Sequence, residues 1–263
     1  MKIQRGAILF NRTRSLAGIL ASVALLACLA CSDPPGRSGA EPPVSPPSQM
    51  MDFNVLYAKN CAGCHGADGK GGAAVPLADP VFLAIADDAA IRRTATNGVR
   101  GTPMSAFAQS AGGMLTDQQM DALVQGIRSW AKPDALAGTI PPSYVAKSAG
   151  DAQRGADVYR TYCSSCHGAN GSGGKAGSIV DGSYLALVSD QDLRTNVILG
   201  RPEWGAPDWR GDVPGRPMSE QEISDVVAWL AAQRTAIPGQ PYPNSAMDRA
   251  ARGTSAGVPG GVQ

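Results

Sequence analysis

The chain has 263 residues with 23 Lys and Arg against 22 Asp and Glu, a net charge of +1 that excludes the basic surface of a nucleic-acid-binding protein. Only 5% of the residues are aromatic while Gly numbers 32 and Pro 20, so bulky core-forming side chains are few for a chain long enough to form two small domains. Both histidines, His65 and His167, end a Cys-x-x-Cys-His string, which excludes His-rich zinc sites and a Ser-His-Asp triad with a spare base.

The N-terminus has the pattern of an export signal. Basic residues among the first 14 precede an apolar run, Ser15 to Ala27, that is shorter than the roughly 20 residues a membrane-spanning helix requires. The run ends at Leu25-Leu26-Ala27-Cys28, which resembles the lipobox of bacterial lipoproteins. We therefore predict a signal peptide with lipobox over residues 1–30 and lipidation at Cys28. Cys31 is the alternative lipidation site, and an ordinary cleaved signal or an uncleaved anchor are the other interpretations.

Two segments are predicted to lack folded structure. Residues 31–50 hold three Pro-Pro pairs and almost nothing apolar to bury, which is typical of an extended, semi-rigid spacer. Residues 237–263 end in a Gly-rich stretch and are predicted to be a disordered tail. A spacer after a lipidated cysteine would hold a domain away from a membrane surface.

The rest of the chain repeats itself. Shifting the sequence by 102 residues aligns, without a gap, the following residues with their partners: Tyr57, Cys61, Cys64, His65, Gly66, Gly69, Gly71, Gly72 and Gly98 on Tyr159, Cys163, Cys166, His167, Gly168, Gly171, Gly173, Gly174 and Gly200. This self-similarity indicates an internal duplication. We predict two domains, residues 51–131 (the first repeat) and 150–236 (the second repeat), joined by a linker over 132–149.

Helical patterns dominate both repeats. A short middle helix is predicted over 87–97 and again over 190–199, each stopped by a glycine suited to a left-handed C-cap. A closing amphipathic helix follows in each repeat, introduced by the capping-box pairs Thr116 with Gln119 and Ser219 with Glu222. The acidic residues that begin the middle helices, Asp87, Asp88, Asp190 and Asp192, are interpreted as caps rather than catalytic carboxylates. Strand signals are weak, so the predicted fold class is all-α.

Cys-x-x-Cys-His is the attachment string of c-type haem. On a helix its three ligating residues share one face, where two thiols can form thioethers to the porphyrin and the imidazole can ligate the iron. A zinc knuckle or a redox dithiol is the alternative. Zinc would need further ligands gathered nearby, and a thioredoxin-like dithiol should follow a strand. The doubled string and the export signal favour haem.

These strings, each followed by a Gly-rich loop and a capped closing helix, resemble class I cytochromes c arranged as a two-domain dihaem protein. The resemblance implies two tandem helical domains, each wrapped on a covalently bound haem c that fills the aromatic-poor core. Cys61, Cys64, Cys163 and Cys166 would hold the haems, and His65 and His167 would be the proximal iron ligands. Such attachment takes place outside the cytoplasm, which agrees with the signal.

The family usually completes the iron shell with a methionine on the loop before the closing helix. In the first repeat we expect Met104 of Gly-Thr-Pro-Met-Ser-Ala-Phe to be this ligand, with Phe107 packing on the haem. Met114 and Met120 are the alternatives, although Met120 lies on the apolar stripe of the closing helix and is more simply a core residue.

The second repeat departs from this pattern. Ala206 aligns with Met104, and Trp209 aligns with Phe107. Met218 is the substitute ligand, but it aligns with Leu115 directly before the N-cap, the position of a hydrophobic staple. The second haem is therefore either five-coordinate or ligated by Met218 after rearrangement of the loop.

The repeats also differ in the groups expected around each iron. In the family a proline carbonyl orients the proximal histidine, a role that Pro76 suits, whereas the equivalent residue is Ser178 in the second repeat. Arg92 and Arg194 could pair with haem propionates or be solvated. Trp204 and Trp209 are interpreted as packing residues rather than electron relays.

The predicted function is electron transfer by a membrane-tethered dihaem cytochrome c, each iron cycling between Fe(II) and Fe(III) on the periplasmic side of a bacterial membrane. Its partners would be membrane-associated redox proteins, and obligate docking on a dehydrogenase or oxidase is one form of this function. The enzymatic alternative is a dihaem peroxidase-like or small-ligand-reducing protein with an open second haem, but no distal imidazole is available for acid–base work. The partner, the direction of electron flow, both potentials and the oligomeric state are left open by the sequence.

Overall fold

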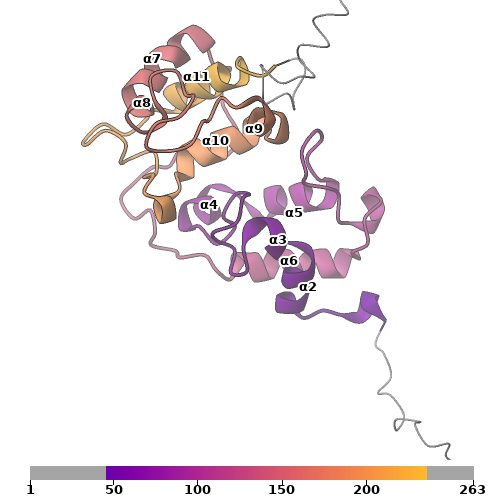
Figure 1. The fold of residues 1–263 in the computed structure, drawn as a ribbon. Coiled ribbons are helices and arrows are strands. Elements are labelled where there is room, and N and C mark those ends of the chain that lie inside the picture. Colours follow the sequence, from indigo (N-terminus) through magenta and orange to yellow (C-terminus); the bar gives the residue numbers. More distant parts are fainter. Residues whose placement is uncertain (1–45, 236–263) are drawn as a thin grey trace, which may run out of the picture. The chain divides into compact units, whose positions relative to one another are not determined.

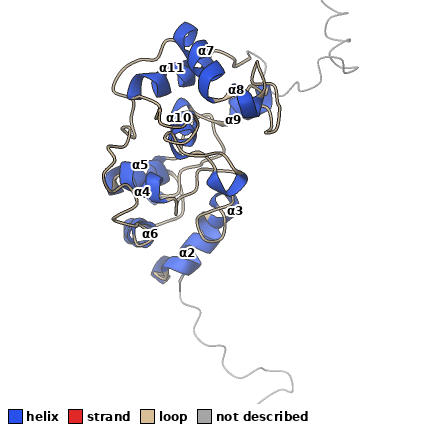
Figure 2. Cartoon of the chain, turned by 90° about the vertical axis from the view of Figure 1, so that its left-hand side faces the viewer, coloured by secondary structure: helices blue, strands red, loops and turns tan. Residues whose placement is uncertain are grey.

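The computed structural model describes residues 46–235, so the signal sequence with Cys28 and Cys31 and the tail 237–263 lie outside the described residues. Within that range every regular element is a helix, and the only β-type pairings are isolated bridges joining Ala108 to Leu115 and Arg201 to Ala206 (Figure 2). The predicted all-α class is confirmed. None of the helices in these residues has the length and apolar character needed to cross a membrane.

The two repeats have the same order of elements (Figure 1). The first contains the 3₁₀ turn η1 (Pro47–Gln49), α2 (Phe53–Asn60), α3 (Ala62–His65), α4 (Pro80–Ile85), α5 (Asp88–Asn97), η2 (Gln109–Ala111) and α6 (Asp117–Arg128). The second contains α7 (Ala152–Tyr162), α8 (Ser164–His167), α9 (Gly182–Leu187), α10 (Asp190–Leu199), η3 (Pro202–Trp204) and α11 (Glu220–Ala231).

The helix ends follow the local sequence. Both predicted capping boxes form, at Thr116 for α6 and at Ser219 for α11. Asp87 caps α5 by accepting from the N–H of Ala90, and Asp192 closes a third box with Ser189 at the start of α10. The carboxylates at these positions therefore satisfy N–H groups that have no partner within the helix.

The closing helices supply much of the core. The apolar stripe of α6 is buried at Met120, Leu123, Val124 and Ile127, and that of α11 at Ile223, Val226, Val227 and Leu230. Helix α6 packs against α2 and α5, and α11 packs against α7 and α10. In each repeat the closing helix thus covers the helix that leads into the Cys-x-x-Cys-His string.

In both repeats the entering helix and the closing helix approach each other closely at a glycine. The glycine lies on the closing helix in the first repeat and on the entering helix in the second. In the first, a β-carbon added to Gly126 of α6 would lie 2.0 Å from the ring of Phe53 on α2. In the second, a β-carbon added to Gly155 of α7 would lie 2.0 Å from the carbonyl oxygen of Asp225 on α11 and 2.7 Å from the side chain of Trp229. Each crossing therefore requires one residue without a side chain.

The predicted linker over 132–149 is hydrogen-bonded to the second repeat. The N–H of Ser143 donates to Glu220 at 2.9 Å, and the guanidinium of Arg194 donates to the carbonyl oxygens of Ser143 and Tyr144 at 2.8 and 3.2 Å. Gln221 donates to the carbonyl of Ala149. These bonds attach the end of the segment to α10 and α11.

Candidate functional site

The two Cys-x-x-Cys-His strings fold alike. Cys61 and Cys163 end α2 and α7 by donating their N–H groups to the carbonyls of Tyr57 and Tyr159 at 2.8 and 2.9 Å. A four-residue helix, α3 or α8, then carries the second cysteine and the histidine. All four cysteines of the described residues are free thiols. The two strings thus present the same set of groups: two thiols and an imidazole on one turn.

Each imidazole is oriented by a backbone carbonyl. Nδ1 of His65 lies 2.7 Å from the carbonyl oxygen of Val75, and Nδ1 of His167 lies 2.9 Å from that of Gly177. A carbonyl oxygen can only accept, so Nδ1 carries the proton and Nε2 keeps a free lone pair. A metal ligand held in one tautomer by a hydrogen bond on its other nitrogen has this arrangement.

The orienting carbonyl is one residue earlier than the sequence suggested, so the assignment to Pro76 and Ser178 is wrong. The reason lies in the Gly-rich loop, where the N–H groups of Ala74 and Ala176 donate back to the second cysteine of each string at 3.0 and 2.9 Å. This bond brings the next carbonyl in the chain to the imidazole. The carbonyl of Pro76 instead accepts from the N–H of Asp79.

Glycine is required where the loop turns back. Gly66 has φ of +85° and its carbonyl accepts from the hydroxyl of Tyr57 at 2.9 Å, and Gly168 with φ of +79° accepts likewise from Tyr159. A β-carbon at Gly72 would lie 2.2 Å from the carbonyl oxygen of Cys64. The aligned glycines therefore preserve one path of the backbone around the histidine.

Burial governs the ionisation of these groups. Desolvation raises the pKa of Cys61 to about 11, and desolvation together with the carboxylate of Asp212 raises the pKa of Cys163 to about 12. A redox dithiol needs a thiolate near neutral pH, so these thiols do not resemble one. Burial also lowers the pKa of His65, which favours the neutral, ligating form of its imidazole.

The methionines of the first repeat have distinct surroundings. Met104 is half-buried on the loop between α5 and η2. Met114 is 82% exposed, and Met120 is fully buried within the stripe of α6. Of the three candidates, only Met104 is neither a core residue nor fully exposed to solvent.

The two arginines that could pair with haem propionates or be solvated both make ion pairs within the protein. Arg92 pairs with Asp117 and Asp121 of α6. Arg194 is 3% exposed, and all three of its nitrogens donate to protein acceptors, including Glu220. Arg194 is therefore neither solvated nor available to a propionate, because its buried nitrogens are already bonded within the protein. Arg92 and Arg194 each pair with a carboxylate in the first turn of the closing helix, Asp117 and Glu220.

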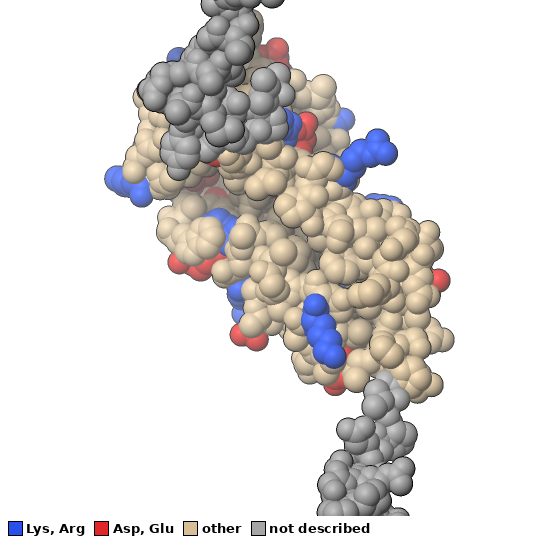
Figure 3. Space-filling view, turned by 45° about the vertical axis from the view of Figure 1, so that its right-hand side comes forward, with Lys and Arg blue, Asp and Glu red and all other residues tan. Residues whose placement is uncertain are grey.

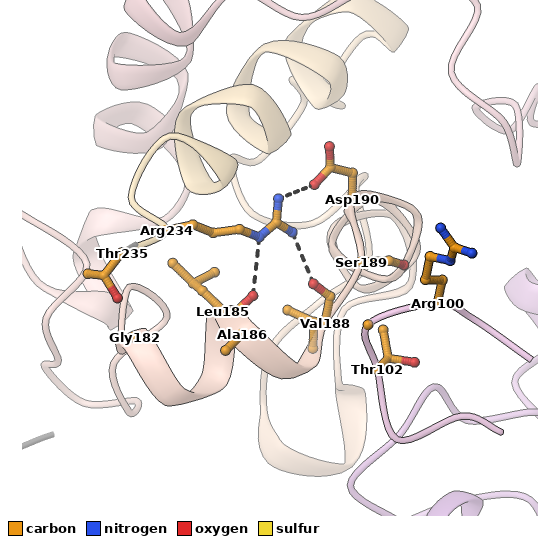
Figure 4. Close-up of a pocket in the computed structure, with 11 residues that line it drawn as sticks. Arg100, Thr102, Gly182, Leu185, Ala186, Val188, Ser189, Asp190, Arg234 and Thr235 are labelled. Carbon is orange, nitrogen blue, oxygen red and sulfur yellow. Dashed lines mark hydrogen bonds and ion pairs between the residues drawn. The ribbon is translucent and has the colours of Figure 1, made fainter. Parts of the chain in front are cut away.

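In each repeat an arginine near the end of the closing helix bonds to two carbonyls and one carboxylate in the middle of the repeat. We call this group of bonds the arginine clamp; the sequence alignment did not reveal it. Arg128 donates to the carbonyls of Leu83 and Ala86 and to Asp88. In the second repeat, Arg234 makes the same three bonds to Leu185, Val188 and Asp190 (Figure 4). The acceptors are aligned but the arginines are not, so the alignment gave no signal. The residues around Arg234, together with Arg100 and Thr102, line a pocket of about 340 Å³.

One face of the molecule carries few charged groups. On the face shown in Figure 3, Lys, Arg, Asp and Glu side chains stand at scattered points among uncharged residues. Most of the charged side chains described above are engaged in ion pairs such as Arg154 with Asp225 at 2.8 Å. This view agrees with the near-neutral charge of the chain.

Comparison with known proteins identifies the repeats. A family model described as cytochrome c oxidase, cbb3-type, subunit III matches residues 48–125 and again 150–230. The chain is 30% identical over 166 residues to the cbb3-type cytochrome c oxidase subunit FixP of Azorhizobium caulinodans, a match that covers 57% of this chain and 52% of that protein. It is 35% identical over 141 residues to subunit CcoP of Azospirillum sp., covering 49% of this chain and 43% of the relative.

A third relative is more distant but is matched over more of its length. The cytochrome c subunit of the cytochrome bc1 complex of Mycobacterium bovis is 24% identical over 223 residues, covering 83% of this chain and 76% of the relative. The chain spans about half the length of the two oxidase subunits. Because the family model covers both repeats, each with its string, helices and histidine–carbonyl bond, the chain belongs to the cbb3-type cytochrome c oxidase subunit III family and is a class I c-type cytochrome.

Proposed function

We propose that this chain is an exported electron carrier with two covalently attached haem c groups, one on each repeat. The observation that carries the proposal is the repeated bond from histidine Nδ1 to the carbonyls of Val75 and Gly177, which leaves each Nε2 free beside a pair of thiols. This donor set fits haem c, since the group needs two thiols and one nitrogen ligand from the same turn.

The cysteines hold the haem. In each repeat the two thiols would add across the two vinyl groups of the porphyrin. For each thiol, the S–H bond and the vinyl π bond would break while one C–S and one C–H bond form, with no net oxidation. Cys61 and Cys64 would serve the first haem, and Cys163 and Cys166 the second. His65 and His167 would bind the irons through Nε2.

The remaining residues set the environment in which the iron works. When bound, the haem supplies an iron that accepts and releases one electron. Met104 would be the sixth ligand in the first repeat, and a thioether there raises the reduction potential. Trp130 packs edge-on against Tyr57, with ring centroids 5.0 Å apart, and Trp229 stacks on Tyr159 at 4.2 Å. Each tryptophan thus packs on the tyrosine whose hydroxyl donates to the glycine directly after the histidine.

We propose further that the chain is lipidated at Cys28 and that its partners lie in a membrane. The lipobox-like sequence supports the anchor. The relatives, subunits of a cbb3-type cytochrome c oxidase and of a cytochrome bc1 complex, support redox partners of that kind. The export signal supports a location on the periplasmic side of the membrane. The chain itself would be a carrier and not an enzyme, because neither repeat has a second imidazole for acid–base work.

Haem counting tests the core of this proposal. The pyridine haemochrome spectrum and the mass of protein matured in a bacterial periplasm should give two haems per chain. A Cys61→Ala, Cys64→Ala variant should keep one, and the matched Cys163→Ala, Cys166→Ala variant should keep the other. A wild-type protein with a single haem would contradict the assignment of one repeat.

Fractionation tests the anchor. Wild-type protein should sediment with membranes and release on detergent treatment, whereas Cys28→Ser should be found in the soluble periplasmic fraction. Cys31→Ser is the matched control and should behave as wild type. If Cys31→Ser is released and Cys28→Ser stays with the membranes, the lipid is on Cys31. If both variants stay with the membranes, lipidation at a single cysteine is contradicted.

A further inference from the structure

The backbone places Ala206 where the first repeat has Met104. In the first repeat the N–H of Val99 donates to the carbonyl of Met104 at 2.8 Å, directly after the glycine that ends α5. In the second repeat the N–H of Arg201 donates to the carbonyl of Ala206 at 2.9 Å, directly after the glycine that ends α10. The two loops therefore have the same register at this point, and the sequence alignment of Met104 with Ala206 is also a structural one.

Met218 has the position and burial of a core residue. Its N–H donates to the carbonyl of Trp209 at 2.9 Å, as the N–H of Leu115 donates to that of Phe107 at 2.8 Å. Met218 is 3% exposed and Leu115 is 6% exposed, each packed into the core just before the N-cap of the closing helix. To reach an iron, Met218 would have to leave a site that the first repeat fills with leucine.

Apart from Met218, the second repeat has no free residue of the two types, methionine and histidine, that usually complete the iron shell. Within residues 150–236, Met218 is the only methionine and His167 the only histidine. Burial raises the pKa of the phenol of Tyr184, which disfavours the phenolate needed for ligation. The second repeat thus offers a proximal ligand without a partner on the other side.

From this juxtaposition of Ala206 with a core-packed Met218, we infer that the second haem has an open sixth position that binds small neutral diatomic molecules such as carbon monoxide or nitric oxide. The inference rests on the proposed attachment of a haem to Cys163 and Cys166. The step is the formation of one dative bond to the ferrous iron, in which no bond breaks and no electron leaves the complex.

The charges of the loop favour neutral over anionic ligands. The guanidinium of Arg201 donates to Glu203 at 2.8 Å and lies over the ring of Trp204 at 3.8 Å. That of Arg210 makes an ion pair with Asp208 at 2.6 Å. Arg216, the third cation of the loop, pairs with Glu222 at 3.0 Å. All three cations of the loop are therefore neutralised by carboxylates, and an anion bound at the iron would meet no free positive charge from this loop.

Carbon monoxide titration of the dithionite-reduced, haem-loaded protein tests the inference. Wild type should bind one molecule per chain, and about half of the haem should be high-spin before the addition. Ala206→Met should bind none and should gain a second near-infrared iron–sulfur band in its oxidised form. Met218→Leu should bind as wild type does. Met104→Ala, the matched variant of the first repeat, should bind two.

Three results would overturn the inference. In the first, the wild type is fully low-spin and binds no carbon monoxide, and Met218→Leu gains binding; Met218 is then the ligand. Wild type that binds none and is unchanged by Met218→Leu has a ligand from elsewhere. Binding that persists in a folded Ala206→Met variant would mean that position 206 does not face the iron. A haem count below two marks failure of the proposed function instead, since the count is independent of the ligand.

Azide tests the selectivity. It should bind the oxidised second haem more tightly in Asp208→Asn than in wild type, because the substitution releases the guanidinium of Arg210. Equal affinities in the two proteins would refute the argument from charge, while the carbon monoxide result would still decide whether the position is open.

Discussion

The pKa of Asp212 is strongly shifted by its surroundings near the second Cys-x-x-Cys-His string. Burial raises the pKa of its carboxyl from 3.8 to about 6, with the carboxylate of Asp208 as the second cause. The same carboxylate contributes to the raised pKa of Cys163. Asp212 therefore lies in the electrostatic surroundings of the second attachment site and is costly to ionise there.

The direction of the pH effect follows from linkage. The folded protein keeps the Asp212 proton in the window between about pH 4 and pH 6, in which the unfolded chain has released it, so the free energy of unfolding falls as pH rises through this window. Asp212→Asn should remove this loss and raise the melting temperature near pH 7, with little change near pH 4. Thermal unfolding followed by circular dichroism at both pH values measures it.

The control for this measurement is Asp134→Asn, since Asp134 is exposed on the segment between the repeats. It should shift neither melting temperature. An Asp212→Asn protein that is destabilised at both pH values would show that the carboxylate makes a favourable interaction in the folded state.

At the scale of elements, the two repeats pack the entering helix against the closing helix with the large and small residues exchanged between the helices. The first repeat places Phe53 on the entering helix and Gly126 on the closing one, whereas the second places Gly155 and Trp229 at the equivalent positions. The tryptophan that packs on the tyrosine moves with them, from Trp130 just past α6 to Trp229 inside α11. A large residue on one helix is matched by a small one on the other.

We expect Gly126→Ala to destabilise the first repeat by about 1–3 kcal/mol, because the new methyl group would meet the ring of Phe53. Phe53→Gly removes that ring, so Gly126→Ala should cost less in the Phe53→Gly background than in wild type. Urea unfolding of the four proteins gives the coupling free energy, which should be about 0.5–3 kcal/mol. Strictly additive effects would contradict the contact.

Particular elements show what the sequence can and cannot predict. The capping boxes and the positions of the C-cap glycines were correct because their signals lie within a few residues of the bonds they make. The left-handed conformation predicted for these glycines was correct only in its positive φ, since their ψ values of −169° and −160° are extended. The carbonyls that orient the histidines were displaced by one residue, since a backbone atom carries no sequence signature. The arginine clamp was missed because Arg128 and Arg234 reach aligned acceptors from positions that do not align.

At the scale of the whole molecule, the segment between the repeats contributes to the fold of the second. Its Ser143 and Tyr144 carbonyls accept from the buried side chain of Arg194, and its Ser143 N–H donates to Glu220. Composition alone suggested a linker, because the prolines and small residues of the segment give no apolar pattern. Its attachment is made mainly by backbone groups, which bond to Arg194 of α10 and to Glu220 and Gln221 of α11.

A boundary experiment follows from this attachment. A haem-loaded fragment of residues 138–235 should be more resistant to urea than one of residues 150–235, by about 1–3 kcal/mol, because the shorter one leaves Arg194 without its carbonyl partners. Arg194→Met should largely abolish the difference between the two fragments. Equal stabilities of the unsubstituted fragments would show that the segment is only a tether.

The hydrogen bonds that orient the two histidines also bear on how a duplicated carrier can diverge. On the proximal side the orienting group is a main-chain carbonyl, so the residues around it can change identity, Pro76 to Ser178 for example, without loss of the bond. On the distal side the proposed ligand, Met104, is a side chain, and one substitution would remove it. A single position can therefore specialise one copy of a duplicated protein while the other copy keeps the proposed role, with the shared architecture left intact.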